Sequence, residues 1–368
     1  MSKVYFTDMR TSFTENLPQK LTRLIDRAGL GTIDFDHKFV AIKIHFGELG
    51  NLAYLRPQYA RALAAYIKER GGIPFLTDCN TLYVGSRKNA PEHIETAYIN
   101  GYTPYATGCQ VIIADGIKGT DEAYIPIDCE EVKTAKIGRA IADADIIISL
   151  NHFKGHEGTG FGGALKNLGM GCGSSAGKAE MHEDEKPTAN PEKCVGCGVC
   201  ARNCAHDAVE MVDKKAHVNY DKCKGCGRCI GVCPTGAMKP SAENGTELLS
   251  RRVSEYAYAV CKDKPNFHIN MVIDISPFCD CYGNNDAPIV PDIGMFASFD
   301  PVALDKACVD AVNEQPIIDN SLLGMQRFKK LGRDHLYTLH PDTRWEAGID
   351  QGAKIGLGSA EYELVKMK

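Results

Sequence analysis

The residues most able to do chemistry form a cysteine repeat near the middle of the chain. CVGCGVCARNCAHDAV begins at residue 194 and CKGCGRCIGVCPTGAM begins at residue 223, a period of 29 residues. Each half follows the pattern Cys-x2-Cys-x2-Cys-x3-Cys. The eight cysteines are Cys194, Cys197, Cys200 and Cys204 in the first half and Cys223, Cys226, Cys229 and Cys233 in the second. Thiolates at such short, regular intervals indicate metal or metal-cluster binding.

The same spacing holds four-iron, four-sulfur (4Fe-4S) clusters in bacterial ferredoxins, where the fourth cysteine of each half ligates the other cluster. We therefore predict two 4Fe-4S clusters. One would be held by Cys194, Cys197, Cys200 and Cys233, and the other by Cys223, Cys226, Cys229 and Cys204. Residues 187–240 resemble the bacterial dicluster ferredoxin module, except that Ala205 follows Cys204 where Pro234 follows Cys233. Two zinc sites are the alternative, but zinc does not explain the third cysteine of each half.

Composition limits the class of protein. The chain has 368 residues, and its 42 basic and 47 acidic residues give a net charge of -5, which provides no basic surface for nucleic acid. No stretch approaches the roughly 18 apolar residues that span a membrane, and the start lacks the apolar core of a signal peptide. We expect a soluble, cytoplasmic protein with no membrane partner. In that reducing compartment its 16 cysteines would not form a disulfide framework.

The elements that must position these residues alternate between strands and helices. Apolar runs predict strands over 39–44, 73–77, 111–114, 145–150 and 269–275. Helical patterns lie between Pro57 and Gly71, over 91–102, 131–142 and 247–260, and after Asp300-Pro301. We predict an α/β fold with an open, mostly parallel or mixed sheet flanked by helices. The α/β domain would be discontinuous, over 1–186 and 241–368, with 187–240 inserted as an α+β dicluster ferredoxin-like domain whose hairpin spans 209–218.

Polar residues follow several predicted strands. They are His45, Glu48 and Asn51, then Asp78, Cys79 and Asn80, then Asn151, His152 and His156, and finally Cys279 and Cys281. In open parallel sheets, ligands bind outside the carboxyl ends of the strands, so these groups should converge on one crevice. We take His45, Glu48, His152, His156 and Lys166 as candidate catalytic residues. A hydrogen-bonded structural role is the alternative for each histidine.

The stretch SLNHFKGHEGTGFGGALKNLGMGCG at 149–173 could bind a ligand. Its G-x-G-x-x-G match lies too far past the strand for a dinucleotide fingerprint, and the residue after Lys166 is Asn167, so it is no Walker loop. A glycine-rich loop entering a helix near Ala164 would offer amides to an anion. The cofactor-binding candidates are Gly158, Gly160, Gly163 and Asn167. A tightly packed turn is the alternative, and His152 and His156 would share a face only if this stretch were helical.

Eight cysteines lie outside the repeat. We interpret Cys109, Cys129 and Cys308 as small buried hydrophobic residues. Cys279 and Cys281, together with Cys172 or Cys261, could form a third metal or redox site. Inert cysteines are the alternative, because the spacing fixes no geometry.

The whole chain resembles a family called Fe-S center proteins, in which a domain of unknown function (number 362) carries an inserted dicluster ferredoxin. The resemblance rests on IKIHFGELGN at 42–51, NHFKGHEGTGFGGALKNLGMGC at 151–172 and SPFCDCYGNNDAPIVPDIGMFASFDPVALDKA at 276–307. It implies iron–sulfur binding and electron transfer without an established substrate.

We therefore predict a redox protein of anaerobic type, which could act as an oxidoreductase, that passes electrons between two 4Fe-4S clusters and a ligand in the crevice. Its partner would be a redox protein or a small anionic ligand, and a further metal or anionic cofactor could bind. Two other hypotheses remain open. One is an electron carrier or docking platform without chemistry of its own, and the other is a metallocofactor maturation protein in which Cys172, Cys279 and Cys281 handle a metal in transit.

Overall fold

One large sheet organises the chain. The computed structural model describes residues 1–242, 244–326 and 334–367. Within them, eight strands pair in the order β16-β1-β15-β14-β7-β2-β3-β4. The strands are β1 (Ser2–Asp8), β2 (Phe39–Lys43), β3 (Ile73–Asp78), β4 (Gln110–Ile113), β7 (Ile146–His152), β14 (Asn266–Val272), β15 (Gly294–Ser298) and β16 (Tyr362–Lys366). The run from β14 to β4 is parallel throughout, whereas β15 is antiparallel to both of its neighbours. The predicted mostly parallel or mixed α/β sheet is confirmed.

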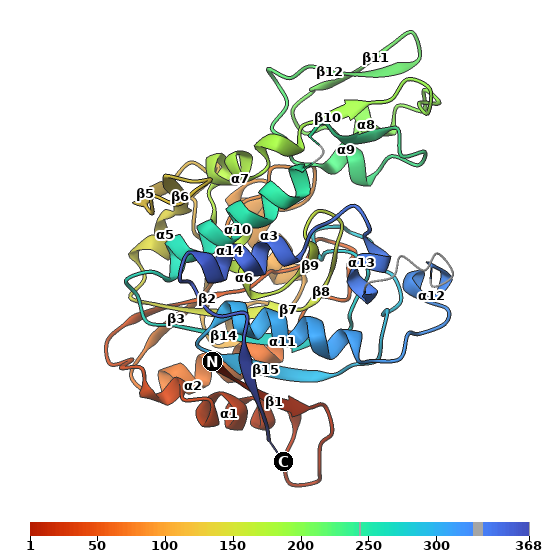
Figure 1. Cartoon of the computed structure of the whole chain (residues 1–368). Coiled ribbons are helices and arrows are strands. Elements are labelled where there is room, and N and C mark those ends of the chain that lie inside the picture. The colour runs from red at the N-terminus through yellow and green to blue at the C-terminus, as the bar shows by residue number, and fades with distance from the viewer. Residues whose placement is uncertain (243, 327–333, 368) are drawn as a thin grey trace.

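Helices cover both faces of this sheet (Figure 1). One face packs against α1 (Leu17–Arg27), α2 (Pro57–Lys68) and α3 (Ala90–Ile99). The other packs against α6 (Ala164–Cys172), α10 (Gly245–Cys261), α11 (Pro301–Asn313) and α14 (Glu346–Lys354). Each face of the sheet has its own apolar core cluster. Neighbouring strand residues face opposite sides, so Ile146 and Ile148 pack with α1, α2 and α3, whereas Ile147 packs on the side of α6, α10, α11 and α14. Burial on both faces explains the continuous apolar run of β7.

The helix predicted over 131–142 is wrong. The chain forms β6 (Thr134–Gly138), antiparallel to β5 (Glu122–Pro126), and only then the short helix α5 (Arg139–Asp143). Ala135 and Ile137 are buried while Lys136 between them is half-buried, so the local apolar period is two rather than 3.6. The strand predicted over 269–275 is found as β14 at 266–272.

The remaining elements are short. They are η1 (Leu30–Thr32), α4 (Pro104–Thr107), β8 (Lys154–His156), β9 (Gly160–Gly162), α7 (Ser175–Met181), η2 (Glu183–Glu185), α12 (Leu322–Gln326) and α13 (His335–Leu339). None of the described helices is long and apolar enough to cross a membrane.

Residues 187–240, which we call the cysteine-rich segment, form small elements of their own at the top of Figure 1. The segment begins and ends with the antiparallel pair β10 (Pro187–Ala189) and β13 (Met238–Pro240). Between them lie α8 (Val199–Arg202), the predicted hairpin of β11 (Val209–Val212) and β12 (Lys215–Val218), and α9 (Arg228–Gly231). A separate apolar cluster includes Val209, Ala216 and Met238.

The sequence repeat of the cysteine-rich segment is also a repeat of backbone shape. Gly198 and Gly227 each precede a four-residue helix, and both have φ 69°. Gly196 and Gly225 both have φ 73°. Left-handed backbone at these positions favours glycine, because a Cβ atom would be strained there. The two cysteine motifs therefore fold alike.

Candidate functional site

The polar residues at the strand ends come together. Because β14, β7, β2 and β3 are parallel neighbours, their carboxyl ends meet at one edge of the sheet. A cavity of about 760 Å³ opens there, between the sheet and the cysteine-rich segment. The predicted residues that line it are His45, Asp78, Cys79, His156, Gly158, Gly163, Lys166, Asn167, Cys279 and Cys281. The predicted convergence of strand-end residues is confirmed for His45, Asp78, Cys79, His156, Cys279 and Cys281, while the chemical roles of all ten stay predictions.

Six predicted residues do not line this cavity: Glu48, Asn51, Asn80, Asn151, His152 and Gly160. His152 is buried, with Nδ1 2.9 Å from an Asp280 carboxylate oxygen and Nε2 2.8 Å from the Ile273 carbonyl oxygen. Both of its ring nitrogens are therefore engaged, and Lys154 Nζ lies 3.4 Å from the same carboxylate. Burial opposes ionisation of Asp280, but His152 and Lys154 hold the pKa of this carboxyl well below its usual range. His152 positions the loop that carries Cys279 and Cys281 rather than facing a ligand.

Glu48 also positions its neighbours. Its carboxylate accepts hydrogen bonds from the Ser86 amide and hydroxyl and lies 3.2 Å from Arg87 Nε. Arg87 is buried, and its other nitrogens reach the Tyr83 hydroxyl at 2.8 Å and His45 Nε2 at 3.1 Å. Glu48 therefore fixes a buried guanidinium beside the imidazole of His45.

The glycine-rich stretch forms a hairpin followed by α6, and ligand binding by its cavity residues stays a prediction. β8 and β9 pair as a hairpin, so His152 and His156 do not share a helical face. At the start of α6, the amides of Ala164 and Leu165 donate to the two carboxylate oxygens of Asp305, at 2.7 and 2.8 Å. These helix amides already have an anionic partner within the chain. The Asp305 carboxylate also explains why position 163 is a glycine, because a Cβ atom there would lie 2.3 Å from a carboxylate oxygen.

Lys166 and Asn167 have separate partners. Asn167 accepts a hydrogen bond from Lys43 Nζ at 2.6 Å, and Lys43 lies 2.9 Å from Asp78. Burial would raise the pKa of Asp78, but the charge of Lys43 and two neighbouring histidines hold it well below its usual range. Lys166 Nζ lies 3.6 Å from Cys279 Sγ, so within the cavity it contacts the Cys-Asp-Cys loop.

Cys279 and Cys281 form a close pair in the cavity. Their sulfurs are 2.6 Å apart, and Cys281 Sγ is 3.7 Å from His45 Nε2. A hydrogen bond from the Cys279 thiol and the nearby Lys166 and His45 hold the pKa of Cys281 well below its usual value. The same hydrogen bond and burial raise the pKa of Cys279. The contact and the nearby cationic groups thus favour a thiolate at Cys281 over one at Cys279.

His45, Cys279 and Cys281 are also close enough to contact one ion, since one ligand atom of each lies within 4.8 Å of the others. Cys172 and Cys261, which the sequence offered as companions for this pair, lie instead in the apolar core with Cys308. Cys109 is buried in the opposite core cluster, and Cys129 is half-buried. Burial confirms the interpretation of Cys109 and Cys308 as small hydrophobic residues.

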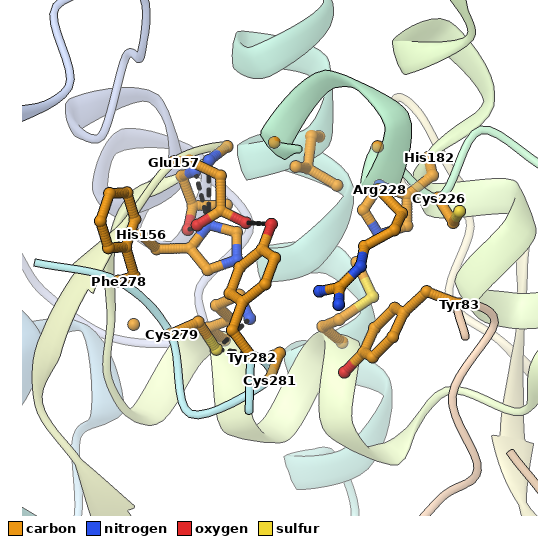
Figure 2. Close-up of a pocket in the computed structure, with 18 of the residues that line it drawn as sticks. Tyr83, His156, Glu157, His182, Cys226, Arg228, Phe278, Cys279, Cys281 and Tyr282 are labelled. Carbon is orange, nitrogen blue, oxygen red and sulfur yellow. Dashed lines mark hydrogen bonds between the residues drawn. The ribbon is translucent and has the colours of Figure 1, made fainter. Parts of the chain in front are cut away.

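Sequence patterns missed several cavity residues, most of which Figure 2 shows. Glu157 is half-buried, and its Oε1 accepts a hydrogen bond from the Tyr282 hydroxyl at 2.5 Å. Its Oε2 has no hydrogen-bond partner among the described residues. Burial raises the pKa of Glu157 despite the bond from Tyr282. Glu157 and Tyr282 each adjoin a residue that the sequence did single out, His156 and Cys281, but neither belongs to a recognisable motif.

Arg228 connects this cavity to the cysteine-rich segment. Its guanidinium carbon lies 4.6 Å from the centre of the Tyr282 ring and 5.9 Å from that of Tyr83. A Cβ atom on Gly231, three residues later, would come within 2.6 Å of the Tyr282 hydroxyl. His206 Nε2 also lies 2.8 Å from the Leu82 carbonyl oxygen. Both halves of the repeat therefore contact the rest of the chain, and the second half also lines the cavity.

Two smaller cavities lie inside the cysteine-rich segment. One is lined by Cys194, Cys197, Cys200 and Cys233, which we call the distal cysteine group. The other is lined by Cys204, Cys223, Cys226 and Cys229, the proximal cysteine group. Each group takes its fourth cysteine from the other half of the repeat. Of these eight described cysteines, only Cys226 lines the large cavity as well. The grouping agrees with the predicted crossed pattern, and cluster binding stays a prediction.

Comparison with known proteins places the chain. The model of a family described as Domain of unknown function (DUF362) matches residues 40–310. A thylakoid-associated protein of Synechocystis is 28% identical over 141 residues, which are 38% of this chain and 40% of that protein. The chain thus matches well under half the length of this curated relative.

Two solved structures are also similar. The lactate racemase apoprotein from Thermoanaerobacterium thermosaccharolyticum is 13% identical, with a TM-score of 0.48, over 99% of this chain and 82% of that one. A Thermotoga maritima protein is 15% identical, with a TM-score of 0.43, over 83% of this chain and 60% of that one.

Proposed function

The chain belongs to the DUF362 family, and we propose that it is an iron–sulfur electron-transfer protein with two 4Fe-4S clusters. The distal and proximal cysteine groups would hold one cluster each, and electrons would pass between the clusters and a ligand in the 760 Å³ cavity. In this proposal residues 187–240 act as an inserted ferredoxin-like domain within the α/β domain.

The observation that carries the proposal is the lining of the two small cavities by four cysteines each. The donor set fits a 4Fe-4S cluster, which needs four thiolates. It does not fit zinc, because four sulfurs around one tetrahedral ion at about 2.3 Å would lie about 3.8 Å apart. No three of these eight sulfurs, all in the described part of the chain, lie within 4.8 Å of one another. A cluster of four irons spreads its ligands more widely than a single ion.

The arrangement also supports a direction along the molecule. The distal group lies near the surface, since Cys197 is exposed and the neighbouring Val195 is 69% exposed. The proximal group adjoins the large cavity through Cys226. A bound cluster moves one electron at a time. We propose that an external redox protein exchanges electrons at the distal group and that a ligand exchanges them at the proximal end.

The large cavity favours a protein that binds a ligand over an electron carrier without chemistry of its own. A carrier needs only an exposed cluster, whereas this chain keeps ionisable groups such as Lys166, Glu157 and Cys281 around a cavity. Such perturbed groups in a cavity are typical of a binding or reaction site. The ligand would be a small molecule that contacts both cationic and carboxyl side chains.

Paired cysteine substitutions test the crossed ligation. Cys194→Ser and Cys233→Ser should both disturb the distal cluster and leave the same electron paramagnetic resonance (EPR) signal from the proximal one. Cys204→Ser and Cys223→Ser should leave the complementary signal. Cys129→Ser, outside both groups, should change neither. If Cys233→Ser instead behaves like Cys223→Ser, the ligands are not crossed, and if no variant changes iron content, the proposal is wrong.

A further inference from the structure

We propose that Cys279 and Cys281 are a redox-active dithiol that stores two electrons at the cavity, next to the proximal cysteine group. The inference rests on the proposed function, because it takes the two iron–sulfur clusters as the source of electrons. It is carried by the 2.6 Å contact between the two sulfurs, by the cationic and imidazole groups around them, and by their position in the cavity that Cys226 also lines.

The surroundings of the pair suit a thiolate. Lys166 Nζ lies 3.6 Å from Cys279 Sγ, and His45 Nε2 lies 3.7 Å from Cys281 Sγ. The Gly47 amide donates to His45 Nδ1 at 3.0 Å. An Arg87 nitrogen, which can only donate, lies 3.1 Å from Nε2, so this ring nitrogen faces both the Arg87 guanidinium and Cys281 Sγ. Lysine and imidazole neighbours activate a cysteine by stabilising its thiolate.

The same contacts argue against a metal ion held by His45, Cys279 and Cys281. A metal-bound Nε2 needs its proton on Nδ1, where the Gly47 amide already points. The Arg87 guanidinium, 3.1 Å from Nε2, would also repel a cation. Finally, two thiolates on one tetrahedral ion would lie about 3.8 Å apart, further than the 2.6 Å found. A pair that can close to a disulfide bond of about 2.05 Å fits these contacts better than two ligands of one ion.

The chemistry balances with one-electron donors. The disulfide between Cys279 and Cys281 takes up two electrons and one proton, the sulfur–sulfur bond breaks, and a thiol and a thiolate result. Bound clusters would supply one electron each, and in return both would be oxidised. Because Cys281 is half-buried and Cys279 is buried, Cys281 is the sulfur that meets a cavity ligand and Cys279 is the one that closes the disulfide.

The position of the pair links it to the cysteine-rich segment. Tyr282 follows Cys281 directly, and its ring packs under Arg228, which stands between Cys226 and Cys229 of the proximal group. The Asp280 carboxylate between the two cysteines is held by His152 and Lys154. The loop is therefore fixed from both sides, which keeps the two sulfurs together and close to the segment (Figure 2).

A stoichiometric reduction tests the inference. Anaerobically purified holoprotein is oxidised with oxidised glutathione, freed of reagent, and titrated with dithionite while EPR records the clusters. Strained or accessible disulfides have higher potentials than low-potential clusters. We expect the first two electrons per chain to produce no cluster signal, because they reduce the disulfide. Over the same interval, the peptide with Cys279 and Cys281 should change from unlabelled to doubly labelled by N-ethylmaleimide in mass spectrometry.

Two variants should remove the lag, that is, the two electrons per chain taken up before the cluster signal appears. In Cys279→Ser and in Cys281→Ser, the cluster signal should appear with the first electron while the iron content stays unchanged. Cys129→Ser, half-buried and away from the cavity, should retain the lag. In the wild-type protein, full iron content without a lag would overturn the dithiol. Thiols blocked by an additional bound metal ion would overturn it as well, and neither result would contradict the two clusters. Absence of iron would remove both proposals.

Discussion

At the scale of single residues, one loop concentrates the reactivity of the cavity. The Cys279-Asp280-Cys281 sequence puts two sulfurs on the same side of an aspartate whose carboxylate is turned to His152 and Lys154. The sulfurs meet Lys166 from α6 and His45 from the end of β2. Four separate parts of the chain thus determine the protonation of two cysteines.

The thiolate character of Cys281 predicts its rate of alkylation. In the reduced protein, iodoacetamide should label Cys281 at pH values below the ordinary thiol pKa of about 8.5, because its folded-state pKa is lowered. Lys166→Gln should move the half-maximal rate to higher pH, since a positive charge is lost. Lys354→Gln, at an exposed position, is the control and should have no effect. The labelled peptide is quantified by mass spectrometry, and an unshifted profile in Lys166→Gln would contradict this role of the lysine.

At the scale of elements, Asp305 of α11 ties α6 to the sheet. Its carboxylate accepts hydrogen bonds from the amides of Ala164 and Leu165 and from the Asn270 side chain on β14, at 2.7 to 2.8 Å. A buried donor that loses its partner costs about 1–3 kcal/mol. The start of α6 therefore depends on a residue about 140 positions later in the chain.

Removal of this cap should destabilise the fold. Asp305→Ala leaves three buried donors without a partner, and we expect it to lower the free energy of unfolding by about 3 kcal/mol or more. Asp305→Asn keeps one accepting oxygen and should lose less. Urea unfolding followed by circular dichroism measures both. Equal stability of wild type and Asp305→Ala would show that the cap is not a significant contact.

The sequence predicted most of the parallel strands, because each is an apolar run bounded by turn residues. It also predicted the edge where His45, Asp78, His156 and Cys281 meet, since that follows from strand direction alone. It could not predict that Asp305 caps α6 or that Arg87 lies beside His45. Both contacts join residues far apart in the chain and leave no local pattern. The strand 134–138 was missed for a similar reason, because its pairing with β5 overrides a helical composition.

At the scale of the whole molecule, the chain has an exposed end and a sheltered end. The distal cysteine group lies at the exposed end with Cys197 and Val195, whereas the proximal group has no exposed cysteine and adjoins the large cavity through Cys226. The contacts of Arg228 and His206 hold the cysteine-rich segment against that body. Electrons that enter at the surface would thereby reach the cavity.

This asymmetry predicts a stepwise loss of iron. On exposure to ferricyanide, the distal cluster should decay first, so that about half of the iron is lost in a faster phase. During that phase Cys194, Cys197 and Cys200 should become open to alkylation while Cys223 and Cys229 stay protected. A time course of labelling and iron content measures this order. Loss in a single phase with equal labelling would contradict the assignment of an exposed and a sheltered group.

The most direct measurement of the central claim is the iron and acid-labile sulfide content of the anaerobically purified chain. Two 4Fe-4S clusters require about eight irons and about eight sulfides per chain, together with a cluster EPR signal after reduction. A preparation that holds zinc and almost no iron would contradict the account, and with it the electron-transfer roles of the distal and proximal cysteine groups.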